Sequence, residues 1–335
     1  ASMLNKELFD STIAFYVDLE RLGNKEAKTV LDLLKQMQKD LLAGIATDRT
    51  ERQLQESQAV IKRYYKDIAD NSQSVADGVS TASANETAKA LATATGQQFT
   101  AGLLPTNEVL KQVASDAIIE GAVQKDWWSK QAINTAFAFQ GQVRQGIVNG
   151  ENLSQIVDRV NGVMMTSRRN AEILVRTSLS TVANNARIET YKANEDLIKG
   201  YEWVASLDFK TCLECGNRDN KQWTMDGKGI NTDIPYTTAP LHFGCRCTMI
   251  AVLKSPEELG IDLPALPART RSSIEGTIDD TSFASWLKSK PPKDIEEVLG
   301  KGRAELWLSG KVTFEQLFKG GTALTLEELL NKYAN

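Results

Sequence analysis

Apolar residues recur at helical spacing along the first part of the chain. One stripe occupies every third or fourth position and comprises Val30, Leu31, Leu34, Met37, Leu41 and Leu42. A weaker stripe follows and comprises Leu54, Val60, Ile61, Tyr64 and Ile68. This spacing is typical of helices that bury one face. The pattern predicts long helices packed along their apolar seams.

The distribution of proline favours the same structure. Pro105 is the only proline before residue 235, and the other seven lie between Pro235 and Pro292. Because proline interrupts helix interiors, long helices can run through the first 234 residues. Residues 75–107 are poor in large apolar side chains, so we expect a thin helix there, followed by a loop and hinge from about Thr95 to Asn107.

The central region returns to a helical pattern. Trp127 and Trp128 are adjacent, so they cannot both face one interior, and one of them is available to a partner. Asn149-Gly150 predicts a helix end and Asn152 an N-cap for the next helix. Arg159 is the only basic residue of that next stretch, which favours a packed helical hairpin over a DNA-reading helix-turn-helix.

A further helix is expected to begin with Ser167 as its cap. It carries four arginines that we interpret as solvated or ion-paired rather than as phosphate ligands: Arg168, Arg169, Arg176 and Arg187.

Two strand-like segments follow, YEWVASLD from Tyr201 and CTMIAVL from Cys247. Antiparallel pairing of the two would bring the ends of the intervening segment together. Between them, KQWTMDGKG predicts another short strand and a turn at Asp226-Gly227. Because this part of the sequence has few large apolar residues, we expect a metal ion to replace much of its core.

Every cysteine of the chain and its only histidine lie between Cys212 and Cys247, from the end of the first strand-like segment to the start of the second. The donors are Cys212, Cys215, His242, Cys245 and Cys247. The spacing is Cys-x2-Cys, then 26 residues, then His-x2-Cys-x-Cys, which is typical of thiolate and imidazole donors around one tetrahedral ion. The sequence therefore predicts one structural zinc ion.

Disulfide and redox chemistry are the competing interpretations. The first ten residues have neither a basic region nor an apolar stretch, so we expect synthesis in a reducing cytosol, where disulfides are disfavoured. Gly216, Asn217 and Asp219 after Cys215 are typical of a turn rather than of the helix start of a redox motif. No stretch of about 18 apolar residues occurs, so no contact with a membrane is expected.

Five donors exceed the four that a structural zinc takes. Cys212 and Cys215 form a compact two-ligand turn, and the other two ligands come from His242, Cys245 and Cys247. If Cys245 to Cys247 is extended, both sulfurs can bind; if His242 to Cys245 forms a turn, Cys247 begins a strand. The sequence leaves both arrangements open.

The excess of donors favours a closed site over a catalytic one with an open position. Nearby carboxylates are interpreted as solvated caps, namely Asp208, Glu214, Asp219 and Asp226. With the one histidine committed to the metal, no Ser-His pair is available, so we expect no catalytic residue and no enzyme activity.

Composition limits the classes of protein further. Of 335 residues, 41% are hydrophobic, which is enough for two or three domains with real cores. The net charge of −4 argues against a protein that coats nucleic acid, and DNA is expected only as a local contact. A zinc-dependent DNA-binding module and a hydrolase or nuclease remain as alternatives.

These patterns predict a mainly α protein with a small zinc-stapled α+β module. We expect five regions: an N-terminal helical region at 1–104, a central helical part at 105–200, the zinc module at 201–254, a Pro-bearing linker at 255–280 and a helical docking extension at 281–335. The extension is rich in large apolar residues, enough for a small core or an interface: Phe283, Trp286, Leu287, Trp307, Leu308, Phe314, Leu317 and Phe318.

The order of these features resembles the Mu F-like minor head proteins of tailed bacteriophages, the head-morphogenesis family. The resemblance covers about residues 120–254. It rests on Arg176-Thr177, Tyr191, Asp208, Thr211-Cys212, Cys215, Asp226-Gly227, Pro240, His242, Cys245, Arg246 and Cys247. Residues 282–318 also look like an extension that often follows this domain. Two departures are Ser178, where the family commonly has an acidic residue, and a long insertion between Lys228 and Thr238.

The resemblance implies a low-copy structural component of the virion, inside the phage head near the portal. It implies a role in head assembly, DNA packaging or DNA ejection without enzymatic activity. The portal protein is the implied partner, with the major capsid protein or a scaffolding protein as further candidates.

Overall fold

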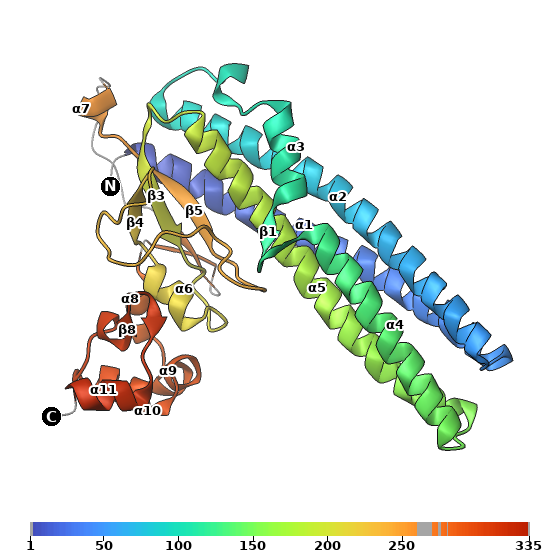
Figure 1. Ribbon diagram of the computed structural model, residues 1–335. Coiled ribbons are helices and arrows are strands. Elements are labelled where there is room, and N and C mark those ends of the chain that lie inside the picture. The colour runs from blue at the N-terminus through green and yellow to red at the C-terminus, as the bar shows by residue number, and fades with distance from the viewer. Residues whose placement is uncertain (1–2, 260–269, 274–275, 280, 334–335) are drawn as a thin grey trace.

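A bundle of four long helices is the largest part of the structure (Figure 1). The computed structural model describes residues 3–259, 270–273, 276–279 and 281–333. The hairpin of α1 (Met3–Thr47) and α2 (Glu51–Thr95) packs against the hairpin of α4 (Gln124–Val148) and α5 (Leu153–Lys192). The four helices share one hydrophobic core, which confirms the mainly α prediction. None of the described helices contains an apolar stretch that could cross a bilayer.

The helix ends follow from local sequence. The Thr50 side chain accepts a hydrogen bond from the backbone N–H of Gln53 at the start of α2, and Gly96 ends that helix with a φ of 69°. Asn152 and Gln155 form a reciprocal capping box at the start of α5, so the predicted cap at Asn152 is confirmed.

The helix start predicted at Ser167 is wrong. α5 runs without interruption from Leu153 to Lys192, because no proline occurs in this span. Instead of capping, the Ser167 hydroxyl donates to the carbonyl of Val163 in the preceding turn, 3.1 Å away, and meets the Thr135 hydroxyl of α4 at 2.9 Å. A residue type that favours caps therefore lies in the middle of a helix.

The loop after α2 connects this helix to a shorter helix that packs on the same bundle. It contains the short turn η1 (Ala101–Leu103) and leads to α3 (Asn107–Asp116), which packs on α2 and α5. Because α2 already shares a core with α5, the expected hinge does not separate two independently packed cores. The hairpin of β1 (Ile118–Ile119) and β2 (Ala122–Val123) then leads into α4.

A three-stranded antiparallel sheet packs at one end of the bundle (Figure 1). β3 (Ile198–Val204) lies between β4 (Gln222–Thr224) and β5 (Thr248–Leu253), as the strand pattern predicts. In the central strand, Tyr201 pairs with Trp223 on one side and with Ala251 on the other. This pairing brings the ends of the cysteine-bearing segment together.

The core behind the sheet is larger than expected from the sequence of the module alone. Trp203 and Trp223 are fully buried in it. α1 adds side chains that are distant in sequence, among them Phe9, and the end of α5 adds Tyr191. Apolar burial therefore contributes substantially to the folding of this region, together with any metal ion.

The C-terminal residues form a compact unit beside α6 (Leu213–Arg218) (Figure 1). The elements are α8 (Phe283–Lys288), α9 (Pro292–Leu299), α10 (Lys301–Leu308), η2 (Glu315–Leu317), β8 (Phe318–Lys319), β9 (Thr322–Ala323) and α11 (Leu326–Tyr333). Except for Leu308, the large apolar residues highlighted in this region are buried, so they form a core rather than an exposed interface. Much of the expected linker lies outside the described residues; its described parts are α7 (Pro256–Leu259) and the pair β6 (Thr270–Ser273) and β7 (Gly276–Asp279).

Candidate metal centre

The first two cysteines lie at the start of α6. Cys212 is the N-cap residue of this helix, and its sulfur accepts a hydrogen bond from the backbone N–H of Cys215 at 3.4 Å. Cys215 lies in the first turn and is buried. The short helix therefore fixes the spacing of both sulfurs.

The other three donors come from the loop that leads into β5. The backbone N–H of Cys245 donates to the carbonyl of His242 at 3.0 Å, which forms a turn. Gly244 within it has a φ of 76°, a conformation that glycine adopts without a steric penalty. Cys247 immediately precedes β5. The turn from His242 to Cys245 is present, and the sulfurs of Cys245 and Cys247 also lie in one group of donors, as the other arrangement requires.

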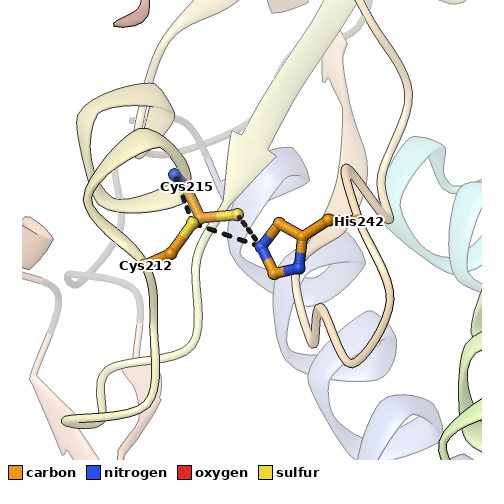
Figure 2. A group of neighbouring side chains, drawn as sticks. All are labelled: Cys212, Cys215 and His242. Atoms are coloured by element: carbon orange, nitrogen blue, oxygen red, sulfur yellow. Dashed lines mark hydrogen bonds between the residues drawn. The ribbon is translucent and has the colours of Figure 1, made fainter. Parts of the chain in front are cut away.

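The five donors form two groups that share Cys215. In the first, the sulfurs of Cys212 and Cys215 lie 3.2 and 3.5 Å from Nε2 of His242, and the three side chains point toward one another (Figure 2). In the second, the sulfurs of Cys215 and Cys245 are 3.6 Å apart, and Cys247 lies close to both. The structure thus gathers all five predicted donors in one place.

These distances fit a tetrahedral ion. Zinc bonds sulfur at about 2.3 Å and nitrogen at about 2.0 Å, which places two sulfurs about 3.8 Å apart and sulfur and nitrogen about 3.5 Å apart. The separations of Cys215 from His242 and from Cys245 agree with these values. The cluster can therefore hold a metal ion.

The orientation of His242 also suits a ligand. Its Nδ1–H donates to the backbone carbonyl of Phe243 at 2.9 Å, so Nε2 carries the lone pair when the ring is neutral. Metal-binding histidines commonly use this arrangement to fix the ring.

The protonation states favour thiolates at two positions. Hydrogen bonding with Cys215 and, to a smaller extent, with His242 lowers the pKa of the Cys212 thiol to about 4. Contact with Cys215 likewise lowers the pKa of Cys245. The Cys212 thiolate raises the pKa of His242 to about 9. The donors thus combine thiolates with neighbouring groups that carry protons. A divalent cation can replace these protons and bind the donors.

Three residues outside the motif hold the His242 loop. The Thr177 hydroxyl of α5 accepts a hydrogen bond from the backbone N–H of Gly244 at 3.0 Å. A carboxylate oxygen of Glu120, at the tip of the β1–β2 hairpin, accepts one from the N–H of Phe243 at 3.3 Å. The Trp127 ring packs edge-on against the Phe243 ring, with centroids 5.0 Å apart.

Sequence reasoning missed the roles of Glu120 and Trp127. Glu120 adopts a φ of 47°, and Gly121 follows it. The pair Glu-Gly between two short apolar segments was therefore a sequence signal for a tight hairpin. No signal in the sequence linked that hairpin to a loop more than 100 residues away. The sequence suggested that one of the two tryptophans is available to a partner. In the structure Trp128 is buried, and Trp127 packs against Phe243 of the His242 loop.

A buried polar cluster joins α5 to β5. The Asn184 carbonyl oxygen accepts hydrogen bonds from the backbone N–H of Met249 at 3.0 Å and from the Thr248 hydroxyl at 2.9 Å. The Arg187 guanidinium donates to the Thr248 hydroxyl and to Asn184. Arg187 is buried rather than solvated, and burial lowers its pKa. This cluster fixes the strand that directly follows Cys247.

Two of the carboxylates interpreted as solvated caps have structural partners. Asp208 pairs with Arg246 at 2.6 Å. Asp219 is buried and accepts hydrogen bonds from two backbone N–H groups, those of Ala205 and Phe283, each at 2.8 Å. Both carboxylates therefore connect loops around the cluster. Asp226, by contrast, is exposed and pairs with Lys228.

The fold and the site define a helical protein with a cysteine- and histidine-rich module inserted between two strands. Residues 138–250 match the family described as Phage Mu protein F like protein. This match shows that the central part of the chain is similar to that family and supports a phage head morphogenesis protein, in agreement with the resemblance found in the sequence. Neither the curated proteins nor the solved structures gave a match to the chain.

Proposed function

We propose that the chain is a structural minor head protein that binds one zinc ion through Cys212, Cys215, His242 and Cys245. The observation that carries the metal assignment is that the Cys215 sulfur lies 3.5 Å from Nε2 of His242 and 3.6 Å from the Cys245 sulfur, separations suited to neighbouring ligands of a tetrahedral ion. Cys247, which follows the turn and immediately precedes β5, is left as a buried neighbour. When bound, the ion supplies a cross-link between α6 and the His242 loop.

A cross-link of this kind is structural. Four protein ligands leave no open position for water or substrate, and the only histidine is used as a ligand. We therefore propose that the protein has no enzymatic activity and contributes to virion assembly.

The proposed location is the interior of the phage head near the portal. The match to a phage head family supports the virion, and the acidic net charge favours protein contacts over general DNA binding. The portal protein is the proposed partner, and a role in DNA packaging or ejection would follow from this position.

The surface that supports contact with a partner protein is on α4. Ile133, Phe137 and Val148 are more than half exposed, with Phe137 at 80% and Val148 at 81%. Large apolar side chains at this exposure are typical of interaction surfaces when they lie along one helix. The C-terminal extension is the weaker candidate, because its aromatic residues are buried.

The experiment is complementation of a phage that lacks this chain. Particles without the protein should have normal shells but reduced DNA content, stability or infectivity. A double Cys212→Ser and Cys215→Ser variant should fail to enter particles, while Thr166→Ala, an exposed change on α5, should be incorporated normally. If the cysteine variant is folded and incorporated at normal levels while infectivity is lost, the metal site has a chemical role after assembly and the structural proposal is wrong.

A further inference from the structure

The described part of the C-terminal extension, residues 281–333, shares its core with the start of the metal-binding helix. Three residues that flank Cys212 in sequence belong to that core or pack against it: Leu207, Phe209 and Leu213. Leu207 is fully buried there. The Phe209 ring lies 5.3 Å from the Trp286 ring, centroid to centroid. The extension is therefore not an independently packed unit.

The contact with α6 is close. Phe283, the first residue of α8, is fully buried against Gly216. A Cβ atom at position 216 would lie 2.4 Å from the Phe283 ring, so only glycine allows this approach. Gly216 directly follows Cys215. The same short helix thus carries a metal donor and the surface on which Phe283 of the extension packs. We call this surface, formed at Gly216, the seat of the extension.

Polar contacts reinforce this seat. The Asp219 carboxylate at the end of α6 accepts from the N–H of Ala205 and, through its second oxygen, from the N–H of Phe283. The Arg218 guanidinium donates to the carbonyl of Gly321 at 3.3 Å, in the turn between β8 and β9. Both residues act on the extension from the C-terminal end of the helix.

A helix as short as α6 is not stable by itself. Its position depends on the N-cap at Cys212, on the packing of the extension, and on whatever holds the two cysteine sulfurs to the His242 loop. A metal ion supplies that last restraint. Without the ion, hydrogen-bond contacts with Nε2 of His242, at 3.2 and 3.5 Å, hold the two sulfurs to this loop.

We propose that metal occupancy at Cys212 and Cys215 controls the docking of the C-terminal extension. The inference rests on the proposed metal site and adds a second role to it. Loss of the ion loosens α6, and the seat for Phe283 is lost with it. Because coupling between two equilibria is reciprocal, loss of the extension contact must also weaken metal binding.

Hydrogen exchange of the full chain with and without a chelator tests the first direction. Removal of the metal should speed amide exchange in peptides from 283–329 by at least about tenfold, equivalent to ~1.4 kcal/mol. Peptides from the middle of α1 and α2 should keep their protection. Unchanged exchange of the extension in metal-free protein, with metal removal verified by elemental analysis, would overturn the proposal.

The second direction uses a variant of the metal-loaded chain. Phe283→Ala removes the contact with Gly216 but no metal donor, so zinc transfer to a chromogenic chelator should be several-fold faster than in the unmodified chain. Phe99→Ala, a partly exposed phenylalanine in the loop after α2, is the matched control and should have no effect. Equal release from all three chains would contradict the coupling, whether or not the extension of the Phe283 variant remains folded.

The two tests also separate this inference from the metal assignment. Protein that contains no metal after purification without chelator would refute both. Protein that contains tightly bound metal but shows no effect in either direction would refute only the coupling.

Discussion

The hydroxyl of Thr177 accepts a hydrogen bond from the backbone N–H of Gly244, and this contact connects the longest element of the central region to the loop that carries His242 and Cys245. Thr177 itself is buried and also donates to the carbonyl of Ile173 within α5. The helix therefore helps to position the His242 loop relative to α6. Thr177 is part of the Arg-Thr pair on which the family resemblance rests.

Thr177→Val should weaken metal binding without removing a donor. The side chain keeps its shape but loses the acceptor for Gly244, which costs ~1 kcal/mol and lowers metal affinity about fivefold. Competition with a chelator of known affinity measures this. Thr166→Val is the control, because Thr166 is exposed on the same helix and bonds only its own preceding turn. Equal affinities of the two variants would show that α5 does not position the loop.

Asn184→Ala should destabilise the junction between α5 and β5. It leaves the Met249 N–H without its acceptor and removes one partner from the buried Arg187, so the free energy of unfolding should fall by about 2–3 kcal/mol. Denaturant titration of the full chain measures the change. Asn185→Ala, at the adjacent and only partly buried position, should cost much less. A loss of similar size in both variants would argue against the buried cluster as a specific support.

Single substitutions should identify the four ligands. Cys215→Ala is expected to abolish tight metal binding, because Cys215 belongs to both groups of donors. Cys212→Ala, His242→Ala and Cys245→Ala should each lower affinity by at least about tenfold. Cys247→Ala should retain one ion per chain. Loss of the metal in Cys247→Ala, with retention in His242→Ala, would assign the ion to the four cysteines.

Phe137→Ser should reduce partner binding and leave stability unchanged, because the side chain is 80% exposed and contributes little to the core. Co-expression with the portal protein of the same phage, followed by size exclusion, measures binding. Phe99→Ser, outside the α4 surface, is the control. Co-elution that survives both changes would place the partner contact elsewhere on the chain.

Local patterns predicted much of this fold. The apolar stripes gave the long helices, and the strand-like segments around the cysteines gave β3 and β5 in their observed antiparallel pairing. The cap at Asn152 was readable because a polar N-cap followed by Gln155 has a direct physical role. The clustering of five soft donors identified the site because few other uses bring these residue types together.

Long-range contacts were outside the reach of these patterns. Ser167 has the chemistry of a cap, yet its hydroxyl finds Thr135 on a neighbouring helix, and the helix continues. The core of the sheet was underestimated because Phe9 lies almost 200 residues before the strands that it covers. Likewise, nothing in the sequence around Asp219 indicates that Phe283 will be its partner. Such contacts depend on packing rather than on local propensity.

The metal content of the full chain, purified from host cells without chelator and measured by elemental analysis, tests the central claim most directly. The account predicts about one zinc ion per chain, lost together with protection of α6 from hydrogen exchange when Cys215 is replaced by alanine. A chain that contains no metal and melts at the same temperature with and without added zinc would contradict it.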